Sequence, residues 1–519
     1  MAKPTLQNYV LLPRPGLPLP TVRESSETQQ AYARLTANTR LDDVLDADLN
    51  SKAVVLDTTG ERGVKLIRLP EDDLPDLRAQ LPGLRIVPEV FYYPQRWQQE
   101  VRQKPEPLVG PAQTAVRIVL RDAVSGQPLA NATVVAFSDF EQRAGEQGVS
   151  DGQGVVRFKN VGGRPIDQLY VYPKLGYWSF WGQKLPALTD GQAFALQPLV
   201  LDGSDAKGFF YPPDDTRSGR GVTVAVVDTG AGPHPDLTIA GGACTVTGED
   251  STDVADVDEH GTHVAGIVAA RGPSSPGEPP TGVRGIAPDA QLYVYRVFAK
   301  NSPGQDRRGN PAGGNPAGGN PGWGASSFAI IKAIEQAVAD GCDLINLSLG
   351  GGPPDPATED AISFAHDNGA VCFVATGNDG RQPVSFPASY SVSLAVSAMG
   401  RRGTFPADTT DAPNVAAPFG MDKENFVAAF SNVGPEVDLI APGVGIVSSV
   451  PGGYAPLSGT SMACPMATGM AARLLSGQPE ILALPRNAAR SEAIVRFLAT
   501  RAKSLGFGPT LEGIGMLFV

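Results

Sequence analysis

Strand and helix patterns alternate from about residue 206 to the end of the chain. Apolar runs typical of buried strands occur in GVTVAVVDTG, AQLYVYRVF, CDLINLSLG, AVCFVATGN and SVSLAVSAM. Helical stretches such as SSFAIIKAIEQAVADG lie between them. This alternation predicts an α/β domain with a parallel sheet covered by helices on both faces. Functional side chains of such sheets gather just beyond the carboxyl ends of the strands.

Residues 1–105 show a different, shorter pattern. NYVLLP and GVKLIRL predict strands, and ETQQAYARL predicts a helix. PEDDLPDLRAQL predicts a second helix, because Leu74, Leu77 and Leu81 fall on one helical face. GLRIVPEVFYYP predicts a further strand with an exposed, proline-punctuated tail. We therefore expect a small α+β domain with a single core.

Residues 110–200 carry short strands separated by turn clusters. TAVRIVLRD, ATVVAFSD and SDGQGVVRFKNV alternate with turn residues, and no convincing helix interrupts them. This pattern predicts a β-sandwich. Nothing in the segment indicates catalysis, so it is predicted to be a packing or recognition module. The predicted domains are thus 1–105, 110–200 and 206–519.

Composition narrows the classes of protein. With 519 residues, two to four domains are expected. The net charge of −12 argues against a general nucleic-acid binder, which needs a basic surface. No stretch of 18 or more apolar residues occurs, so no membrane span is predicted. The N-terminus lacks the pattern of a signal peptide. We expect a cytoplasmic protein or one exported without a visible signal.

The four cysteines form no CxxC pair, so a zinc site is not predicted and free thiols are expected. Residues 309–324, GNPAGGNPAGGNPGWG, form a low-complexity insert that cannot bury a core. We expect a surface loop there, serving either as a lid near the functional site or as an inert excursion.

Four polar residues stand at predicted strand ends or helix starts. Asp228 ends a strand, His260 and Ser461 begin helices, and Asn378 follows another strand. Nucleophilic catalysis by serine needs a base and a carboxylate that orients the base. An amide can in addition stabilise an oxyanion. Each residue alone is also typical of a turn or a cap; together, at one edge of one sheet, they indicate chemistry.

The motifs around these residues resemble the subtilisin-like serine proteases. They are VAVVDTGAGPHPDL, HGTHVAGIVAA, VATGNDG and GTSMACPMATG, with INLSLGG and FSNVGPEVDLIAPGVGI between them. The resemblance covers about 215–519, and GIGMLFV resembles the usual close of the catalytic domain, so no C-terminal appendage is expected. It implies an Asp228–His260–Ser461 triad, with an oxyanion hole made by Asn378 and the Ser461 N–H.

The same resemblance implies the substrate site. The channel is expected to pair with substrate backbone through Ser348, Leu349 and Gly350, and the neighbouring cleft to include Ala375 and Gly377. Ser385 is expected near the floor of the main specificity pocket. No acidic residue is evident in that pocket, which predicts an apolar or broad preference.

No cofactor is required for catalysis in this family. Asp236 is a candidate ligand for structural calcium, but no loop of oxygen ligands accompanies it, so calcium is not predicted. Pro465 is expected near the first turn of its helix. Cys464 and Met466 depart from the usual residues of the motif, and Cys464 is expected to pack the helix without taking part in chemistry.

The N-terminal segments gain candidate roles from this resemblance. Residues 1–105 are similar to the family's inhibitory propeptides, whose tail here, EVFYYPQRW, would lie in the cleft as a product-like strand. An ordinary accessory domain is the alternative. Residues 110–200 resemble carboxypeptidase-regulatory or transthyretin-like β-sandwiches. Such a domain is unusual at this place in the chain and leaves the cleavage point open.

The leading hypothesis is a serine endopeptidase that acts on proteins or peptides and is made as a precursor inhibited by its own N-terminal domain. A catalytically silent peptide-binding protein, with its cleft blocked by that domain, is the alternative. A third hypothesis is an adhesion or targeting protein in which residues 110–200 carry the main role.

Overall fold

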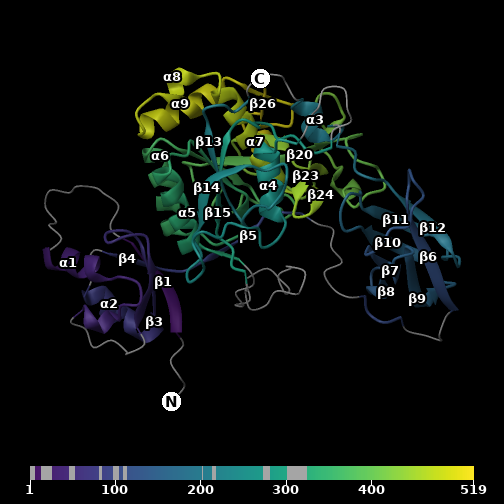
Figure 1. Ribbon diagram of the computed structural model, residues 1–519, viewed down its shortest axis with the longest axis horizontal. Coiled ribbons are helices and arrows are strands. Elements are labelled where there is room, and N and C mark those ends of the chain that lie inside the picture. The colour runs from purple at the N-terminus through teal and green to yellow at the C-terminus, as the bar shows by residue number, and fades with distance from the viewer. Residues whose placement is uncertain are drawn as a thin grey trace, which may run out of the picture.

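The computed structural model describes residues 6–12, 26–45, 53–80, 84–97, 105–108, 114–201, 203–212, 218–272, 281–300 and 324–519. These residues form three units in chain order, and the first two lie on opposite sides of the third in Figure 1. Residues 309–323 of the low-complexity insert, and Leu81 of the predicted helix face, lie outside the described ranges.

The first unit is a four-stranded antiparallel sheet of order β2-β3-β1-β4 with two helices. Its elements are β1 (Leu6–Leu12), α1 (Ser26–Arg34), β2 (Val54–Thr58), β3 (Lys65–Pro70), α2 (Leu74–Gln80) and β4 (Arg85–Pro88). Short 3₁₀ turns cover Leu41–Asp43 and Glu71–Asp73.

The β1 strand buries both of its faces, as the period-two alternation of a strand allows. Tyr9 and Leu11 pack in the unit's own core, whereas Val10 and Leu12 join an apolar cluster that includes Phe328 of the third unit. The predicted strand after residue 84 is in fact two strands, because β5 (Phe91–Pro94) leaves this sheet and joins another.

The second unit consists of two sheets, β11-β10-β7-β8 and β12-β6-β9, packed around one apolar cluster. Its strands are β6 (Thr114–Asp122), β7 (Thr133–Asp139), β8 (Ala144–Val149), β9 (Val155–Gly162), β10 (Ile166–Tyr172), β11 (Phe180–Leu185) and β12 (Gln192–Leu196). Trp178 fixes the unit to the third one, because its ring packs with Ala270, Val283 and Val447. The Trp181 N–H also donates to the Asp408 carbonyl at 2.6 Å.

The third unit is built on an eight-stranded sheet of order β14-β15-β13-β17-β19-β20-β21, with β22 also pairing with β20. Its strands are β13 (Thr223–Asp228), β14 (Ile239–Cys244), β15 (Gln291–Arg296), β17 (Leu344–Leu347), β19 (Val371–Ala375), β20 (Leu394–Arg401), β21 (Asn425–Val427) and β22 (Leu439–Pro442). All neighbours are parallel except the β20–β21 pair.

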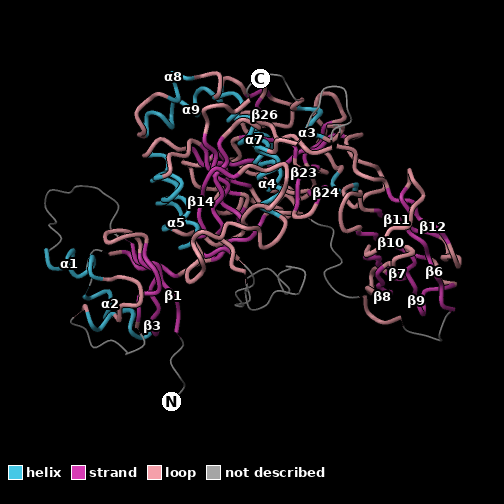
Figure 2. Tube along the Cα trace, in the orientation of Figure 1, coloured by secondary structure: helices cyan, strands magenta, loops and turns pink. Residues whose placement is uncertain are grey.

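Helices cover both faces of this sheet, as predicted (Figure 2). On β13, Val224 and Val226 pack in the cluster that contains α4 and α7, whereas Ala225 and Val227 pack in the one that contains α5 and α6. The strand is therefore apolar throughout because both of its faces are buried. The helices are α3 (Ala206–Phe210), α4 (His260–Ala269), α5 (Ser327–Ala339), α6 (Pro356–Asp367), α7 (Thr460–Leu475), α8 (Pro479–Leu482), α9 (Ala488–Ala499) and α10 (Pro509–Glu512).

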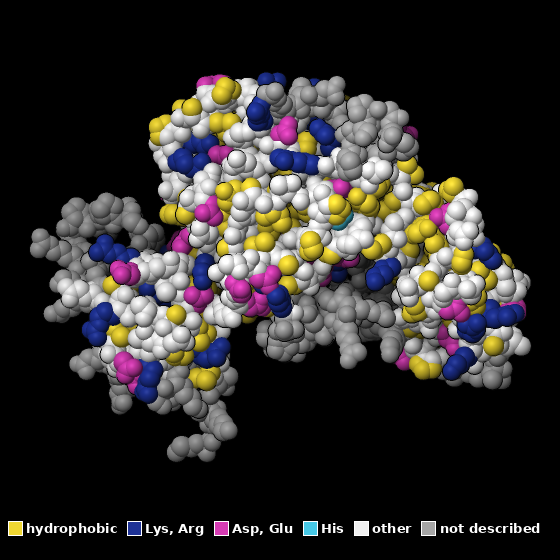
Figure 3. Space-filling model, viewed as in Figure 1, with side chains coloured by type: hydrophobic (Ala, Val, Ile, Leu, Met, Phe, Trp, Pro, Cys, Tyr) yellow, Lys and Arg dark blue, Asp and Glu magenta, His cyan; other side chains and the backbone are white. Residues whose placement is uncertain are grey.

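Short strands complete the unit, namely β16 (Ala325–Ser326), β18 (Leu349–Gly350), β23 (Ile446–Val450), β24 (Gly453–Leu457), β25 (Ala502–Lys503) and β26 (Met516–Leu517), with a 3₁₀ turn at Ala412–Asn414. Side chains of both charge signs are interspersed over the face of the molecule seen in Figure 3. None of the helices in the described ranges has both the length and the apolarity needed to cross a bilayer.

Candidate active site

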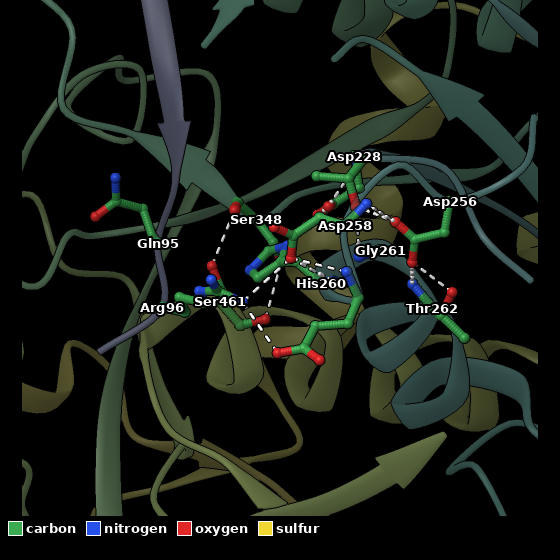
Figure 4. A network of polar contacts seen from close by, with 12 residues as sticks. Gln95, Arg96, Asp228, Asp256, Asp258, His260, Gly261, Thr262, Ser348 and Ser461 are labelled. Atoms are coloured by element: carbon green, nitrogen blue, oxygen red, sulfur yellow. Dashed lines mark hydrogen bonds and ion pairs between the residues drawn. The ribbon is translucent and has the colours of Figure 1, made fainter. Parts of the chain in front are cut away.

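The four predicted polar residues meet at the carboxyl edge of the large sheet. Asp228 is the last residue of β13, and His260 is the first residue of α4. Ser461 is the second residue of α7, and Asn378 follows the end of β19. The strands β13, β17 and β19 are parallel neighbours, so their carboxyl ends open on one side. Figure 4 shows three of the residues, Asp228, His260 and Ser461, close together.

Asp228 holds the imidazole of His260 through one short hydrogen bond. The distance from His260 Nδ1 to Asp228 Oδ1 is 2.7 Å, and the same carboxylate oxygen accepts the Thr229 N–H at 2.7 Å. Both the His260 and the Asp228 side chains are buried. Because Nδ1 faces the carboxylate, Nε2 is the nitrogen left for a reacting proton. Nε2 is buried and has no hydrogen-bond partner among the described residues.

The Ser461 hydroxyl is turned away from the histidine. Its Oγ donates to the Ser348 carbonyl at 2.9 Å. A rotation about the Cα–Cβ bond of Ser461 is therefore needed before Oγ can give its proton to His260 Nε2. The structure thus pairs His260 with Asp228 and holds the Ser461 hydroxyl on the Ser348 carbonyl.

Pro465 lies farther into its helix than expected. It is the sixth residue of α7, in the second turn, and the prediction of a first-turn position was wrong. A proline there cannot donate to the carbonyl four residues earlier. That carbonyl belongs to Ser461, and it accepts the Ser348 Oγ–H at 2.9 Å instead. Because this helix hydrogen bond is missing, the Ser461 carbonyl can accept the Ser348 hydroxyl, and this bond links α7 to the segment that contains Ser348.

Asn378 and the Ser461 N–H lie beside each other as hydrogen-bond donors. The Oδ1 of Asn378 accepts from the Thr460 N–H and the Thr460 hydroxyl, each at 2.9 Å. This orientation leaves Nδ2 as a buried donor, which finds no acceptor within the described ranges. A buried donor without an acceptor is costly, so its retention is typical of a group that acts on a transient charge.

The channel next to these residues is filled by the chain's own β5. This strand lies antiparallel between β16 and β18, with Leu349 opposite Pro94 and Gly350 opposite Tyr93. The Gln95 N–H donates to the Ser348 carbonyl at 3.2 Å. The predicted channel residues Ser348, Leu349 and Gly350 therefore all line this segment.

The tail runs on past the nucleophile, so it lies in the cleft as an intact substrate would and not as a product. The Gln95 carbonyl accepts the Ser461 N–H at 3.0 Å, and the Trp97 backbone N–H donates to the Ser458 carbonyl at 2.7 Å on the far side. The expected exposure of the tail is also wrong, since Tyr92 is completely buried. Its ring packs among apolar side chains of the third unit.

The other two predicted cleft residues have different surroundings. Ala375 ends β19 and is buried in the core beneath the site. Gly377 has a φ of +109°, and a Cβ there would lie 2.3 Å from Asn432 Nδ2 and 2.8 Å from Ser385 Oγ. Only glycine fits this backbone without displacing those groups. Ser385, predicted near the pocket floor, thus lies directly beside Gly377.

Sequence reasoning missed Gly459 and the pair Asp258 and Glu259. A Cβ on Gly459 would lie 2.4 Å from the Gln95 carbonyl oxygen, so glycine leaves room for the strand in the cleft. Asp258 and Glu259 accept hydrogen bonds from Arg96. Two consecutive acidic residues directly before His260, in DVDEHGTH, were the available signal.

Ser458, the other serine in the stretch LSGTS (residues 457–461), is held by hydrogen bonds within the protein. Its hydroxyl donates to Asp411 at 2.5 Å and accepts the Gly445 N–H at 2.8 Å. Burial raises the pKa of the Asp411 carboxyl to about 6, and the Ser458 hydrogen bond opposes that rise.

We expect the free energy of unfolding of Asp411→Asn to change less with pH than that of the wild type between about pH 4 and pH 6. The wild-type carboxyl keeps its proton in the folded state over this window but loses it on unfolding. The free energy of unfolding therefore falls as pH rises through the window, by roughly 3 kcal/mol at most. Urea unfolding at several pH values, in a Ser461→Ala background, measures how the free energy of unfolding changes with pH in the presence and absence of the Asp411 carboxyl. Equal slopes with and without Asp411 would contradict the assignment.

We expect Asn378→Ala to lower kcat by about 10²- to 10³-fold with little change in KM, because a donor at this place would act on charge that develops in the transition state. Asn378→Asp is the matched variant, since it keeps Oδ1 for Thr460 but removes the donor. Steady-state kinetics on one peptide substrate compares them. If the Asp variant keeps wild-type kcat, Asn378 only positions Thr460.

The remaining predicted groups are structural. Buried Cys464 packs within α7, and burial raises the pKa of its thiol. Asp236 accepts from the Val283 N–H at 2.8 Å and the Tyr454 hydroxyl at 3.0 Å, so its carboxylate is engaged within the protein. Desolvation lowers the pKa of His263 to about 3, which keeps its ring neutral. Within the described ranges, no group of three or more His, Cys, Asp or Glu side chains is placed to hold a metal ion.

Comparison with known proteins finds a matching family and several relatives. A model of the Peptidase_S8 family, described as the subtilase family, matches residues 219–512. Subtilisin BL of Lederbergia lenta is 37% identical over 263 residues, which are 50% of this chain and 79% of that protein. Subtilisin Savinase of the same organism is 36% identical with the same coverage. M-protease of Shouchella clausii is 36% identical over 50% of this chain and 56% of its own length.

Proposed function

The chain belongs to the subtilase family of serine endopeptidases, and we propose that it is made as a precursor that carries its first cleavage site, Gln95–Arg96, in its own active site. Hydrolysis of peptide bonds follows from the family. The catalytic roles of the named residues, the inhibitory role of the first unit and the processing bond are the proposal. The observation that carries it is the hydrogen bond from the Ser461 N–H to the Gln95 carbonyl.

The reaction at this bond uses the groups around it. Ser461 Oγ attacks the carbonyl carbon of Gln95 while His260 Nε2 takes the hydroxyl proton, and Asp228 stabilises the imidazolium. The carbonyl oxygen becomes an oxyanion held by the Ser461 N–H and Asn378 Nδ2. His260 then gives its proton to the amino group of Arg96, which leaves. Water, deprotonated by His260, hydrolyses the acyl group on Ser461 and restores the enzyme.

The first unit is well placed to inhibit. Its β5 is hydrogen-bonded to both walls of the channel, so it occupies the backbone positions that a substrate strand needs. Tyr92 fills a buried apolar site, and Asp57 pairs with Lys332 of α5 at 3.0 Å. Because these contacts lie before Gln95, cleavage would not remove them. A cut chain would stay inhibited until residues 1–95 dissociate or are degraded.

Cleavage at Gln95 would leave the β-sandwich with the enzyme. Trp178 and Ser179 contact the third unit, the latter through a 2.7 Å hydrogen bond to Thr410. The processed enzyme would then comprise residues 96–519. This assigns residues 110–200 to the mature protein, where they brace the region around Thr410.

We expect the purified full chain to yield fragments 1–95 and 96–519 on incubation, as followed by intact mass at successive times. Peptide hydrolysis should lag behind the cut, because the fragment still fills the cleft. The Ser461→Ala chain is the control and should keep its full mass. Cleavage at another bond would overturn the processing site. A wild-type chain that is neither cut nor active on peptides would favour a silent peptide-binding protein.

A further inference from the structure

Residues on both sides of the Gln95–Arg96 bond are held in the site. The residues after this bond therefore show how the enzyme would contact the part of a substrate that leaves with the new amino group. Gln95 precedes the bond, with its carbonyl on the Ser461 N–H, and Trp97 is tied to the Ser458 carbonyl beyond it. Arg96 and Trp97 therefore occupy the first two positions after the scissile bond. The side chains that meet them form the leaving-side subsites.

The first position faces two carboxylates, Asp258 and Glu259, here termed the acid pair. Arg96 Nη1 donates to Asp258 Oδ1 at 3.1 Å and to Glu259 Oε1 at 3.2 Å (Figure 4). The side-chain exposures are 16% for Arg96, 5% for Asp258 and 39% for Glu259. A guanidinium this far from water is favourable only when it is paired, and the low exposure strengthens the pairing.

Asp258 of the acid pair is also fixed in place by the helix that carries His260. Asp258 Oδ1 accepts the N–H groups of Glu259 and His260 at 2.7 and 3.2 Å, at the start of α4. Its carboxylate is thus oriented before any substrate arrives, so a cationic side chain pays no cost to order it. A neutral or acidic residue at the first position would leave the Asp258 carboxylate without a cationic partner.

The second position offers an aromatic surface. The ring of Trp97 stacks on Phe430, with centroids 5.7 Å apart and an interplanar angle of 23°. Offset stacking of this kind favours a flat aromatic side chain over an aliphatic one. The two subsites are made by different elements and recognise different chemistry, so they can be tested independently.

We infer that this enzyme selects protein substrates on the leaving side, preferring a cationic residue directly after the scissile bond and an aromatic residue next. The inference rests on the proposed function, because it takes Gln95–Arg96 as the bond aligned for cleavage. Selection at this side acts through differential binding in the transition state, so it should alter kcat/KM.

The test uses the full chain after self-processing and release of residues 1–95, with peptides that match residues 91–99 except at the residue after glutamine. We expect kcat/KM to be highest with Arg at that position, about tenfold lower with Gln, and about tenfold lower again with Glu. Each tenfold factor corresponds to about 1.4 kcal/mol of differential binding. In Glu259→Gln, and more so in the double variant with Asp258→Asn, the Arg-over-Gln ratio should approach one. In Glu259→Lys the Arg-over-Glu preference should reverse. Replacing Trp by Leu at the next position should lower kcat/KM about fivefold.

The ratio separates recognition from damage, because a merely structural fault near His260 would slow all peptides equally and leave the ratio unchanged. Glu492→Gln is the matched control, since it removes one exposed carboxylate on α9 and should keep the wild-type ratio. Cleavage without a preference for Arg, or a preference that survives in the double variant, would overturn this inference alone. Cleavage of none of the peptides, or cleavage that persists in Ser461→Ala, would instead overturn the proposed function.

Discussion

Replacing Ser461 by alanine is expected to lower kcat/KM on a peptide substrate by about 10⁵- to 10⁶-fold. In the proposed mechanism the hydroxyl oxygen is the protein atom that bonds to the substrate carbon, and no other side chain named in that mechanism takes this role. The Ser461 N–H and Asn378 would remain, so weak residual catalysis by oxyanion stabilisation is expected. Hydrolysis of a fluorogenic peptide, together with labelling by a serine-directed phosphonate, measures the loss.

Ser458→Ala is the matched control for this prediction. It removes the other hydroxyl of the same segment, which bonds to Asp411 and the Gly445 N–H and not to reacting atoms. We expect turnover within about tenfold of the wild type and normal phosphonate labelling, with some loss of stability because Asp411 loses its donor. Equal inactivation of both variants would contradict the assignment of Ser461 as the nucleophile.

Replacing Asp228 by asparagine is expected to lower kcat by about 10⁴-fold with little effect on the fold. An asparagine amide can donate to His260 Nδ1, which then places the ring proton on Nε2. In that tautomer Nε2 cannot accept the Ser461 proton. The buried 2.7 Å contact between His260 Nδ1 and Asp228 Oδ1 makes this the group that sets the tautomer.

The Asp228→Asn defect should be partly reversible by pH, which distinguishes it from misfolding. At high pH, direct attack by hydroxide or by an ionised serine does not need the histidine, so the gap to the wild type should narrow. Kinetics from neutral to alkaline pH, with circular dichroism at each pH as the control for folding, test this. Loss of activity that is constant with pH and accompanied by altered dichroism would indicate structural damage instead.

The α/β architecture could be predicted because the signals for it are local. A short, mostly apolar run such as VTVAVVD is typical of a strand buried on both faces, and Val224 and Ala225 do point into different cores. The candidate catalytic residues could be named for a related reason. Asp228, His260 and Ser461 each end or begin an element, and parallel strands bring such ends to one edge.

The split of residues 84–95 into β4 and β5 could not be predicted in the same way. Both strands have similar composition, and only the partners available in space decide that β4 pairs with β1 and β5 with β16 and β18. Backbone pairing between distant segments carries no local pattern. The place of Pro465 in the second turn is a further case, because the Ser348 hydroxyl that compensates for it lies more than a hundred residues away.

The sequence by itself determined most elements of the third unit, its parallel sheet and the candidate reacting groups, because periodicity and residue chemistry are local properties. Only the tertiary structure decided which peptide bond lies across Ser461, where the serine hydroxyl points, and that Arg96 meets the acid pair. Those facts depend on contacts between segments far apart in the chain, and their geometry is set by packing. The proposed processing bond and leaving-side preference therefore come from the fold.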